Sequence, residues 1–164
     1  MDRRSLALSI AAVVSLAASA GRAAAQSNPY AKLIGKWVMD TTNGPDDKGL
    51  PKSETLVFSR ISGGIRITAT EDDGQGPSTS GFNCLAPPSG GLNDQGKGQS
   101  IRCTVRPTAD SVMYALDAID SAKKTTPIER GRLVVQSNGL LRDQYDAMTD
   151  TPPTHHRHIY RKVS

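Results

Sequence analysis

The chain carries its three histidines within four positions near the C-terminus, in the stretch THHRHIYRKV at residues 154–163. They are His155, His156 and His158. Neutral imidazole binds zinc, copper, nickel and haem iron, and it also works as an acid or a base near neutral pH. This stretch is therefore the first place to look for a metal or haem site.

A β-strand would separate these histidines, because successive side chains on a strand point to opposite faces. His156 and His158 would then share one face with Tyr160, while His155 would lie on the other face. At most a His-x-His pair remains, and a metal site needs further ligands, for which carboxylates such as Asp143 or Asp146 are the remaining candidates. Arg157 and Arg161 flank the pair and would repel a cation. A solvated strand face is the favoured interpretation, and metal or haem binding through His156 and His158 is a weak alternative.

Other local motifs for catalysis or ion binding are weak. The acidic segment EDDGQG at residues 71–76 lacks the alternating carboxylates of a calcium loop, so it predicts a plain turn. No G-x-S-x-G motif is present, and no local motif singles out a pair of catalytic carboxylates. We therefore expect no catalytic residues, no enzymatic activity and no cofactor.

The N-terminus resembles a signal peptide and predicts export. Arg3 and Arg4 precede an apolar run from Leu6 to Ala18, and small residues follow at positions 23–25. Cleavage after position 25 is expected, and cleavage after Ala20 is a second option. The run is too short for a membrane span and no lipid-modified cysteine follows, so no stable membrane anchor is expected. A periplasmic or secreted location, in a bacterium, follows from this interpretation.

Residues 26–164 then form one domain by length. The 164-residue chain has a formal charge of +4, and the leader holds three of the 20 basic and one of the 16 acidic side chains, which leaves +2. Basic residues are scattered, whereas nucleic-acid binding needs a clustered basic surface. Nucleic acid is therefore not an expected partner.

The two cysteines, Cys84 and Cys103, predict a disulfide. An even pair in an exported protein is best explained by a bridge, and this one would close a loop of about 20 residues. A catalytic thiol is the less favoured alternative.

Strand patterns dominate the rest of the chain. The clearest is ETLVFSRI followed by Gly63-Gly64 and IRITATED, in which Ile65, Ile67 and Ala69 alternate with polar residues. Asn138-Gly139 marks a second hairpin turn. By contrast, residues 72–99 are rich in glycine, proline and serine and predict a long loop.

About eight strands joined by short turns, with no helix of useful length, predict an all-β antiparallel up-and-down barrel. Gly35-Lys36-Trp37, the segments PKSET and GGIRITAT, and the terminal HIYRKV together resemble a family of small secreted bacterial lipocalin-like barrels. The resemblance implies that Trp37 closes one end of the barrel against a basic side chain of the last strand. Here that partner is Arg161 or Lys162.

The resemblance also permits a small apolar ligand inside the barrel. The residues expected to line such a site are Trp37, Ile65, Ile67, Tyr114, Leu116, His158 and Tyr160. Ordinary core packing would explain the apolar ones equally well. We expect a non-catalytic binding protein. The alternatives are a protein-interaction module or inhibitor that uses the 72–99 loop, whose partner the sequence does not identify, and the haem or metal protein considered above.

Overall fold

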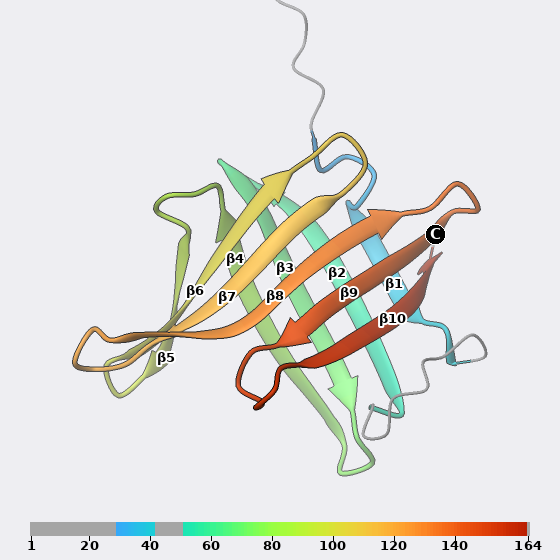
Figure 1. Cartoon of the computed structure of the whole chain (residues 1–164). Helices are drawn as coiled ribbons and strands as arrows, with labels where there is room; N and C mark the ends of the chain where they lie inside the picture. Colours follow the sequence, from blue (N-terminus) through green and yellow to red (C-terminus); the bar gives the residue numbers. More distant parts are fainter. Residues whose placement is uncertain (1–28, 42–50, 164) are drawn as a thin grey trace, which may run out of the picture.

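The computed structural model describes residues 29–41 and 51–163, and the predicted signal peptide lies outside these ranges (Figure 1). The described residues form ten strands. The strands are β1 (Gly35–Met39), β2 (Ser53–Ile61), β3 (Gly64–Asp72), β4 (Pro77–Leu85), β5 (Gly91–Gly96), β6 (Gln99–Pro107), β7 (Val112–Ile119), β8 (Thr125–Val135), β9 (Leu140–Ala147) and β10 (Thr154–Val163). Within the same ranges no helix is long and apolar enough to cross a bilayer.

The strands form one antiparallel sheet in the order β4-β3-β2-β1-β10-β9-β8-β7-β6-β5. A further pairing, Leu85 with Thr104, joins β4 to β6 in parallel. This pairing turns the sheet into a barrel of nine strands, with β5 attached beyond β6. The predicted up-and-down barrel is confirmed, with one barrel strand more than the eight expected.

One end of the barrel is closed by a tryptophan. Trp37 is 1% exposed and its Nε1 donates a hydrogen bond to the carbonyl of Leu33, in the turn that precedes β1. Lys162 is its cross-strand partner on β10, with Nζ 5.2 Å from the ring centroid. Arg161 points to the other face and pairs with Asp40. Of the two candidates, Lys162 is therefore the basic partner of Trp37.

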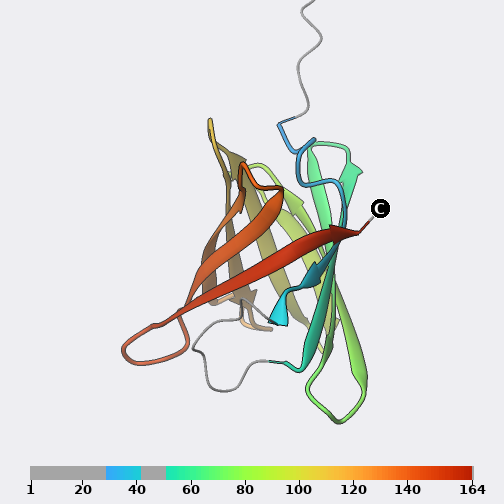
Figure 2. The same ribbon diagram turned by 90° about the vertical axis from the view of Figure 1, so that its right-hand side faces the viewer.

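The opposite end is the mouth of the barrel. Figure 2 shows the β3–β4 and β9–β10 hairpins at this lower end, and the turn that carries Leu33 at the upper end. The acidic turn between β3 and β4 is a plain hairpin turn, as expected. Asp72 and Asp73 accept hydrogen bonds from the backbone N–H groups of Gly74 and Gln75.

The prediction of a loop over residues 72–99 is wrong. β4 and β5 lie in this segment, and β4 is hard to recognise because its inward residues, Ser78, Ser80, Phe82 and Cys84, include only one large apolar side chain. The period-2 pattern is present, but hydrophobicity does not reveal it. The alternative of an interaction module built on a long loop loses its structural basis.

The predicted disulfide is present, and it crosses the seam where the barrel closes. Cys84 on β4 and Cys103 on β6 are both fully buried and lie next to the single β4–β6 pairing. Asn93 on β5 reinforces the seam, because its side-chain amide accepts from the N–H of Asn83 at 2.7 Å and donates to the carbonyl of Asn83 at 3.2 Å. Gly91 permits this close approach, since a Cβ there would lie 1.9 Å from the Asn83 oxygen.

Candidate functional site

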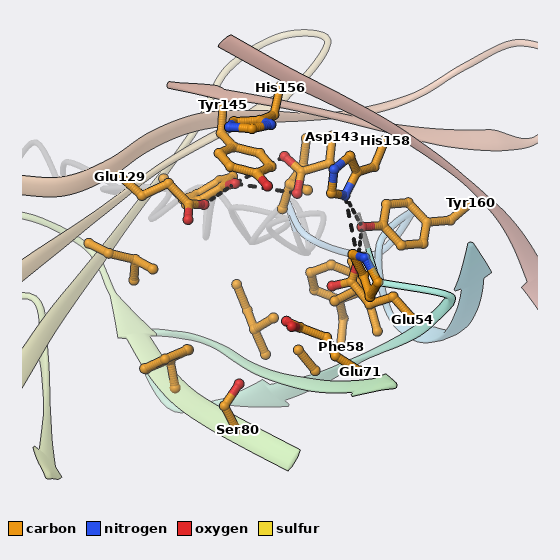
Figure 3. A pocket seen from close by; sticks show the side chains of 18 residues that line it. Glu54, Phe58, Glu71, Ser80, Glu129, Asp143, Tyr145, His156, His158 and Tyr160 are labelled. Carbon is orange, nitrogen blue, oxygen red and sulfur yellow. Dashed lines mark hydrogen bonds and ion pairs between the residues drawn. The ribbon is translucent and has the colours of Figure 1, made fainter. Parts of the chain in front are cut away.

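A cavity of about 340 Å³ lies inside the barrel between the core around Trp37 and the mouth (Figure 3). This volume is within the range of about 300–1,000 Å³ that is usual for ligand pockets. Its apolar lining consists of Pro51, Leu56, Phe58, Ile67, Ala69, Phe82, Leu116 and Leu133. Its polar lining consists of Glu54, Glu71, Ser80, Tyr114, Glu129, Asp143, Tyr145, His156, His158 and Tyr160.

Strand alternation sorts these residues into layers. On β2 the inward residues run from Phe58 near the closed end, through Leu56, to Glu54 near the mouth. On β10 they run from Tyr160 through His158 to His156. The cavity is therefore apolar at its base and increasingly polar towards the mouth.

A buried acid cluster forms around Tyr114. Its hydroxyl lies 2.5 Å from Glu129 Oε1 and 3.0 Å from Asp143 Oδ1. Burial, followed by the charge of Glu129, raises the pKa of Asp143 well above its usual range. Burial is also the main cause of the raised pKa of Glu129. Burial and the two neighbouring carboxyls raise the pKa of Tyr114. In all three groups the surroundings therefore favour the protonated form.

A second cluster joins β10 to β2. The hydroxyl of Tyr160 donates to Glu54 Oε2 at 2.7 Å, and His158 Nδ1 lies 3.1 Å from the same hydroxyl. Burial, followed by the charge of Glu54, raises the pKa of Tyr160. The imidazole of His158 is 5% exposed, and its Nε2 has no hydrogen-bond partner among the described residues. A buried nitrogen without a partner costs free energy, so a ligand atom could satisfy it.

The outermost residues lie at the mouth. His156 stacks on Tyr145, its cross-strand partner, with ring centroids 4.9 Å apart. Glu71 on β3 faces Glu54 directly across the β2–β3 ladder. Burial, followed by the charge of Glu54, raises the pKa of Glu71.

The residues predicted for the ligand site separate into two groups. Five of them line the cavity: Ile67, Tyr114, Leu116, His158 and Tyr160. Trp37 and Ile65 do not, because both belong to the buried core towards the closed end, and Ile65 pairs with Cys84 at the seam. The pair His156 and His158 points inwards with Tyr160, so the favoured interpretation of this face as a solvated surface is wrong. His155 lies outside and pairs with Asp146.

The described residues provide no ligand set for the alternative of metal binding through His156 and His158. Within the described ranges no group of three or more histidine, cysteine, aspartate or glutamate side chains is arranged to hold a metal ion. The rings of His156 and His158 are 6.5 Å apart, and His158 Nδ1 faces Tyr160 and Glu54.

Three of the four carboxyls of the cavity were missed from the sequence, and the fourth, Asp143, was considered only as a further metal ligand. Glu54 and Glu71 each lie near the end of a recognised strand, where a charged residue is usually exposed to solvent. One signal was available. Continuing the inward series of β3 through Ile67 and Ala69 leads to Glu71, and continuing that of β2 through Phe58 and Leu56 leads to Glu54.

Fold and cavity together define the class: an antiparallel up-and-down β-barrel with an internal cavity. No family model matches the chain, and no curated protein matches it. Among solved structures, the wild-type fluorescent protein UnaG is similar, with 15% identity, a TM-score of 0.49, and coverage of 82% of this chain and 99% of that one. A UnaG mutant has 16% identity, a TM-score of 0.47, and coverage of 80% and 96%.

Proposed function

We propose that this protein is an exported, non-catalytic binding protein that holds a small molecule in its barrel. The observation that carries the proposal is the cavity of about 340 Å³, which combines an apolar base with polar groups near the mouth. Pockets for small molecules usually have this composition, in which apolar walls provide affinity and a few polar groups fix orientation.

Two features support export. The leader-like N-terminus is one. The other is the Cys84–Cys103 bridge, since structural disulfides persist mainly in oxidising compartments such as the periplasm or the extracellular space.

The arrangement of hydroxyl groups supports binding rather than catalysis. A hydrolytic nucleophile needs a base within hydrogen-bonding distance. Ser80 is the one serine or threonine that lines the cavity, and the described residues offer it no hydrogen bond to a histidine or carboxylate. The carboxyls of Glu54 and Glu129 are bonded to tyrosines instead.

The test uses 2-(1-naphthyl)ethanol, a neutral fluorescent probe of suitable size, and a variant that fills the cavity. Ala69 faces the cavity midway along β3, between Leu56 and Ser80 on the adjacent strands. Ala69→Phe should weaken probe binding at least about tenfold, since the added ring occupies the apolar volume. Thr68→Phe, which adds a ring to the outer face of the same strand, is the matched control.

Fluorescence titration measures both variants, and circular dichroism verifies that each is folded. Saturable binding that survives in Thr68→Phe and is lost in Ala69→Phe supports the proposal. Binding that is equal in both variants would place the probe outside the barrel and contradict it.

A further inference from the structure

The polar groups of the cavity are strongly biased towards one sign of charge. Four carboxyls line it, whereas none of the described lining residues is lysine or arginine. The arginines of the neighbouring strands lie outside. Arg106, Arg130 and Arg132 line a groove on the outer face of the barrel. A ligand with a negative group would meet no complementary charge inside.

Two of these carboxyls face each other, and no lysine or arginine among the described lining residues lies between them. Glu54 and Glu71 are direct cross-strand partners whose side chains point into the cavity, and like charges in that position destabilise a sheet. Glu54 accepts a hydrogen bond from Tyr160, and His158 Nδ1 lies 3.5 Å from Glu54 Oε2. Glu71 forms no hydrogen bond or ion pair with any described residue. In Figure 3 its carboxyl group reaches into the open part of the cavity.

His158 provides an independent indication. The hydrogen of Tyr160 goes to Glu54, its nearer partner at 2.7 Å, so His158 Nδ1 donates its own hydrogen to the Tyr160 oxygen. His158 Nε2 is buried, and it has no hydrogen-bond partner among the described residues. In the neutral imidazole with its hydrogen on Nδ1, this atom presents a lone pair to the cavity. A hydrogen-bond donor on a ligand would satisfy it.

We propose that the ligand is a small organic cation, with an ammonium or similar N–H-bearing group that lies between Glu71 and Glu54 and an apolar body that packs against Phe58, Ile67 and Phe82. This inference rests on the proposed function and adds the chemical class of the ligand. The carboxylates of Glu71 and Glu54 accept hydrogen bonds, and a protonated amine supplies several donors together with a positive charge. A bare metal ion does not fit, because the described residues contain no three-ligand cluster.

Binding should depend on pH in a direction that identifies the charge of the ligand. The titratable groups that face the cavity are Glu54 on β2, Glu71 on β3, Tyr114 on β7, Glu129 on β8, Asp143 and Tyr145 on β9, and His156, His158 and Tyr160 on β10. The raised pKa values of Glu71 and Glu129 mean that these carboxyls gain charge above the ordinary glutamate value of 4.5. Affinity for a cation should therefore increase from pH 5 to pH 8.

The experiment compares three probes that share one ring system: 2-(1-naphthyl)ethylamine, a cation; 2-(1-naphthyl)ethanol, which is neutral; and 1-naphthylacetate, an anion. The expected order of affinity at pH 8 is amine, then alcohol, then acid, with the amine about tenfold tighter than the alcohol. Between pH 5 and pH 8 the amine should bind more tightly as the pH rises, whereas the alcohol should change little.

Glu71→Gln tests the position of the charge. Glu71 lies at the mouth and bonds to no described side chain, so its replacement should leave the fold intact. The variant should bind the amine about five- to tenfold more weakly and the alcohol as before. Asp146→Asn is the matched control, because Asp146 lies beside Tyr145 but faces outwards to His155. It removes the same charge without changing the cavity.

The outcomes separate this inference from the proposed function. If the alcohol or the acid binds inside the barrel but the amine binds no more tightly than the alcohol, the cationic ligand is excluded and the binding function stands. The same holds if Glu71→Gln and Asp146→Asn weaken amine binding equally. If none of the three probes binds, both proposals fail.

Discussion

At the scale of single residues, the number of hydrogens available to the Tyr114 cluster indicates which of its groups is protonated. The Tyr114 hydroxyl has one hydrogen but lies within hydrogen-bonding distance of two carboxyls, Glu129 and Asp143. Two short contacts need two hydrogens, so one carboxyl must also be protonated. Asp143 is the better candidate, since it is buried and its pKa is raised well above its usual range. Tyr114 then donates to Glu129 and accepts from Asp143.

The position of Tyr114 depends on a residue without a side chain. Gly131 is its cross-strand partner, and a Cβ at that position would lie 2.2 Å from Tyr114 Cζ. The tyrosine ring therefore lies over Gly131, and this places its hydroxyl between the two acids.

Gly131→Ala should therefore displace Tyr114 and break both of its hydrogen bonds. We expect a loss of about 2–4 kcal/mol in the free energy of unfolding, which combines overpacking with buried polar groups that lose their partners. Urea unfolding measures the loss, and a double-mutant cycle with Tyr114→Leu identifies its cause. With the ring removed, Gly131→Ala should cost much less. Additive losses would show that the clash with Tyr114 is not responsible.

Which side chains point into the barrel could be predicted only in part from the sequence. The alternation of β10 correctly grouped His156, His158 and Tyr160, but it could not say which face points inwards. The deciding information is long-range, since Tyr160 bonds to Glu54, 106 positions earlier. A strand pattern also cannot reveal that Glu54 and Glu71 face a cavity. Polar residues on an inward face look the same in sequence as residues exposed to water.

At the scale of elements, the seam between β4 and β6 differs from every other strand contact in the barrel. Adjacent barrel strands elsewhere share ladders of at least four residue pairs, whereas β4 and β6 share one pair, Leu85 with Thr104. The Cys84–Cys103 bond and the amide of Asn93 supply the remaining connections. Covalent and side-chain bonds replace backbone pairing at this position.

Replacing both cysteines with serine should weaken the seam before it weakens the rest of the barrel. In the chain-entropy description, a bridge over a separation of 19 residues contributes about 3 kcal/mol, so global stability should fall by about that amount. Native-state hydrogen exchange should show faster exchange on β4, β5 and β6 than expected from the global change alone. Exchange on the β1–β10 ladder provides the internal control. An equal acceleration in all strands would contradict a local role for the bridge.

The sequence predicted the bridge but not the strands that it joins. Two cysteines have one possible intramolecular pairing, so their number, together with the predicted export, was enough to predict the bridge. β4 and β5 were missed because glycine, serine and asparagine fill positions that usually carry branched or aromatic side chains. Glycine is needed at position 91 because the backbone of Asn83 approaches it closely. This requirement comes from tertiary structure, whereas in the sequence the glycine indicates a turn.

At the scale of the whole molecule, charge is sorted between the inside and the outside of the barrel. Acidic groups line the cavity, and arginines line the outer groove on β6–β8. The positive formal net charge of the chain, +4, therefore gives no indication of the acidic groups in the interior. The sequence-based prediction of a small apolar ligand did not anticipate this arrangement.

The buried acids should make the protein more stable in mildly acidic solution than at pH 8. Burial raises the pKa values of Asp143 and Glu129, so the folded chain binds more protons than the unfolded chain. This contribution is fully present below the unfolded-state values near 4 and is lost as the pH rises through the folded-state values. The slope approaches about 1.4 kcal/mol per pH unit for each proton taken up.

Urea unfolding between pH 5 and pH 8 measures this slope. Asp143→Asn should flatten it, since asparagine keeps a donor for Tyr114 and does not titrate. Asp110→Asn is the control, because Asp110 is exposed and its pKa is lowered by its bonds to Thr108 and Arg132. Stability that increases from pH 5 to pH 8 would contradict the protonated state of the cluster.

The strand order also determines when the cavity can form. The break in the sheet falls in the middle of the chain, while the first and last strands, β1 and β10, lie side by side at the centre of the strand order. β10 carries His156, His158 and Tyr160, so this strand supplies one wall of the cavity. Until β10 pairs with β1, the barrel has neither the Trp37–Lys162 contact nor the Glu54–Tyr160 bond. The molecule therefore gains its closed end and its polar interior together, when β10 docks between β1 and β9.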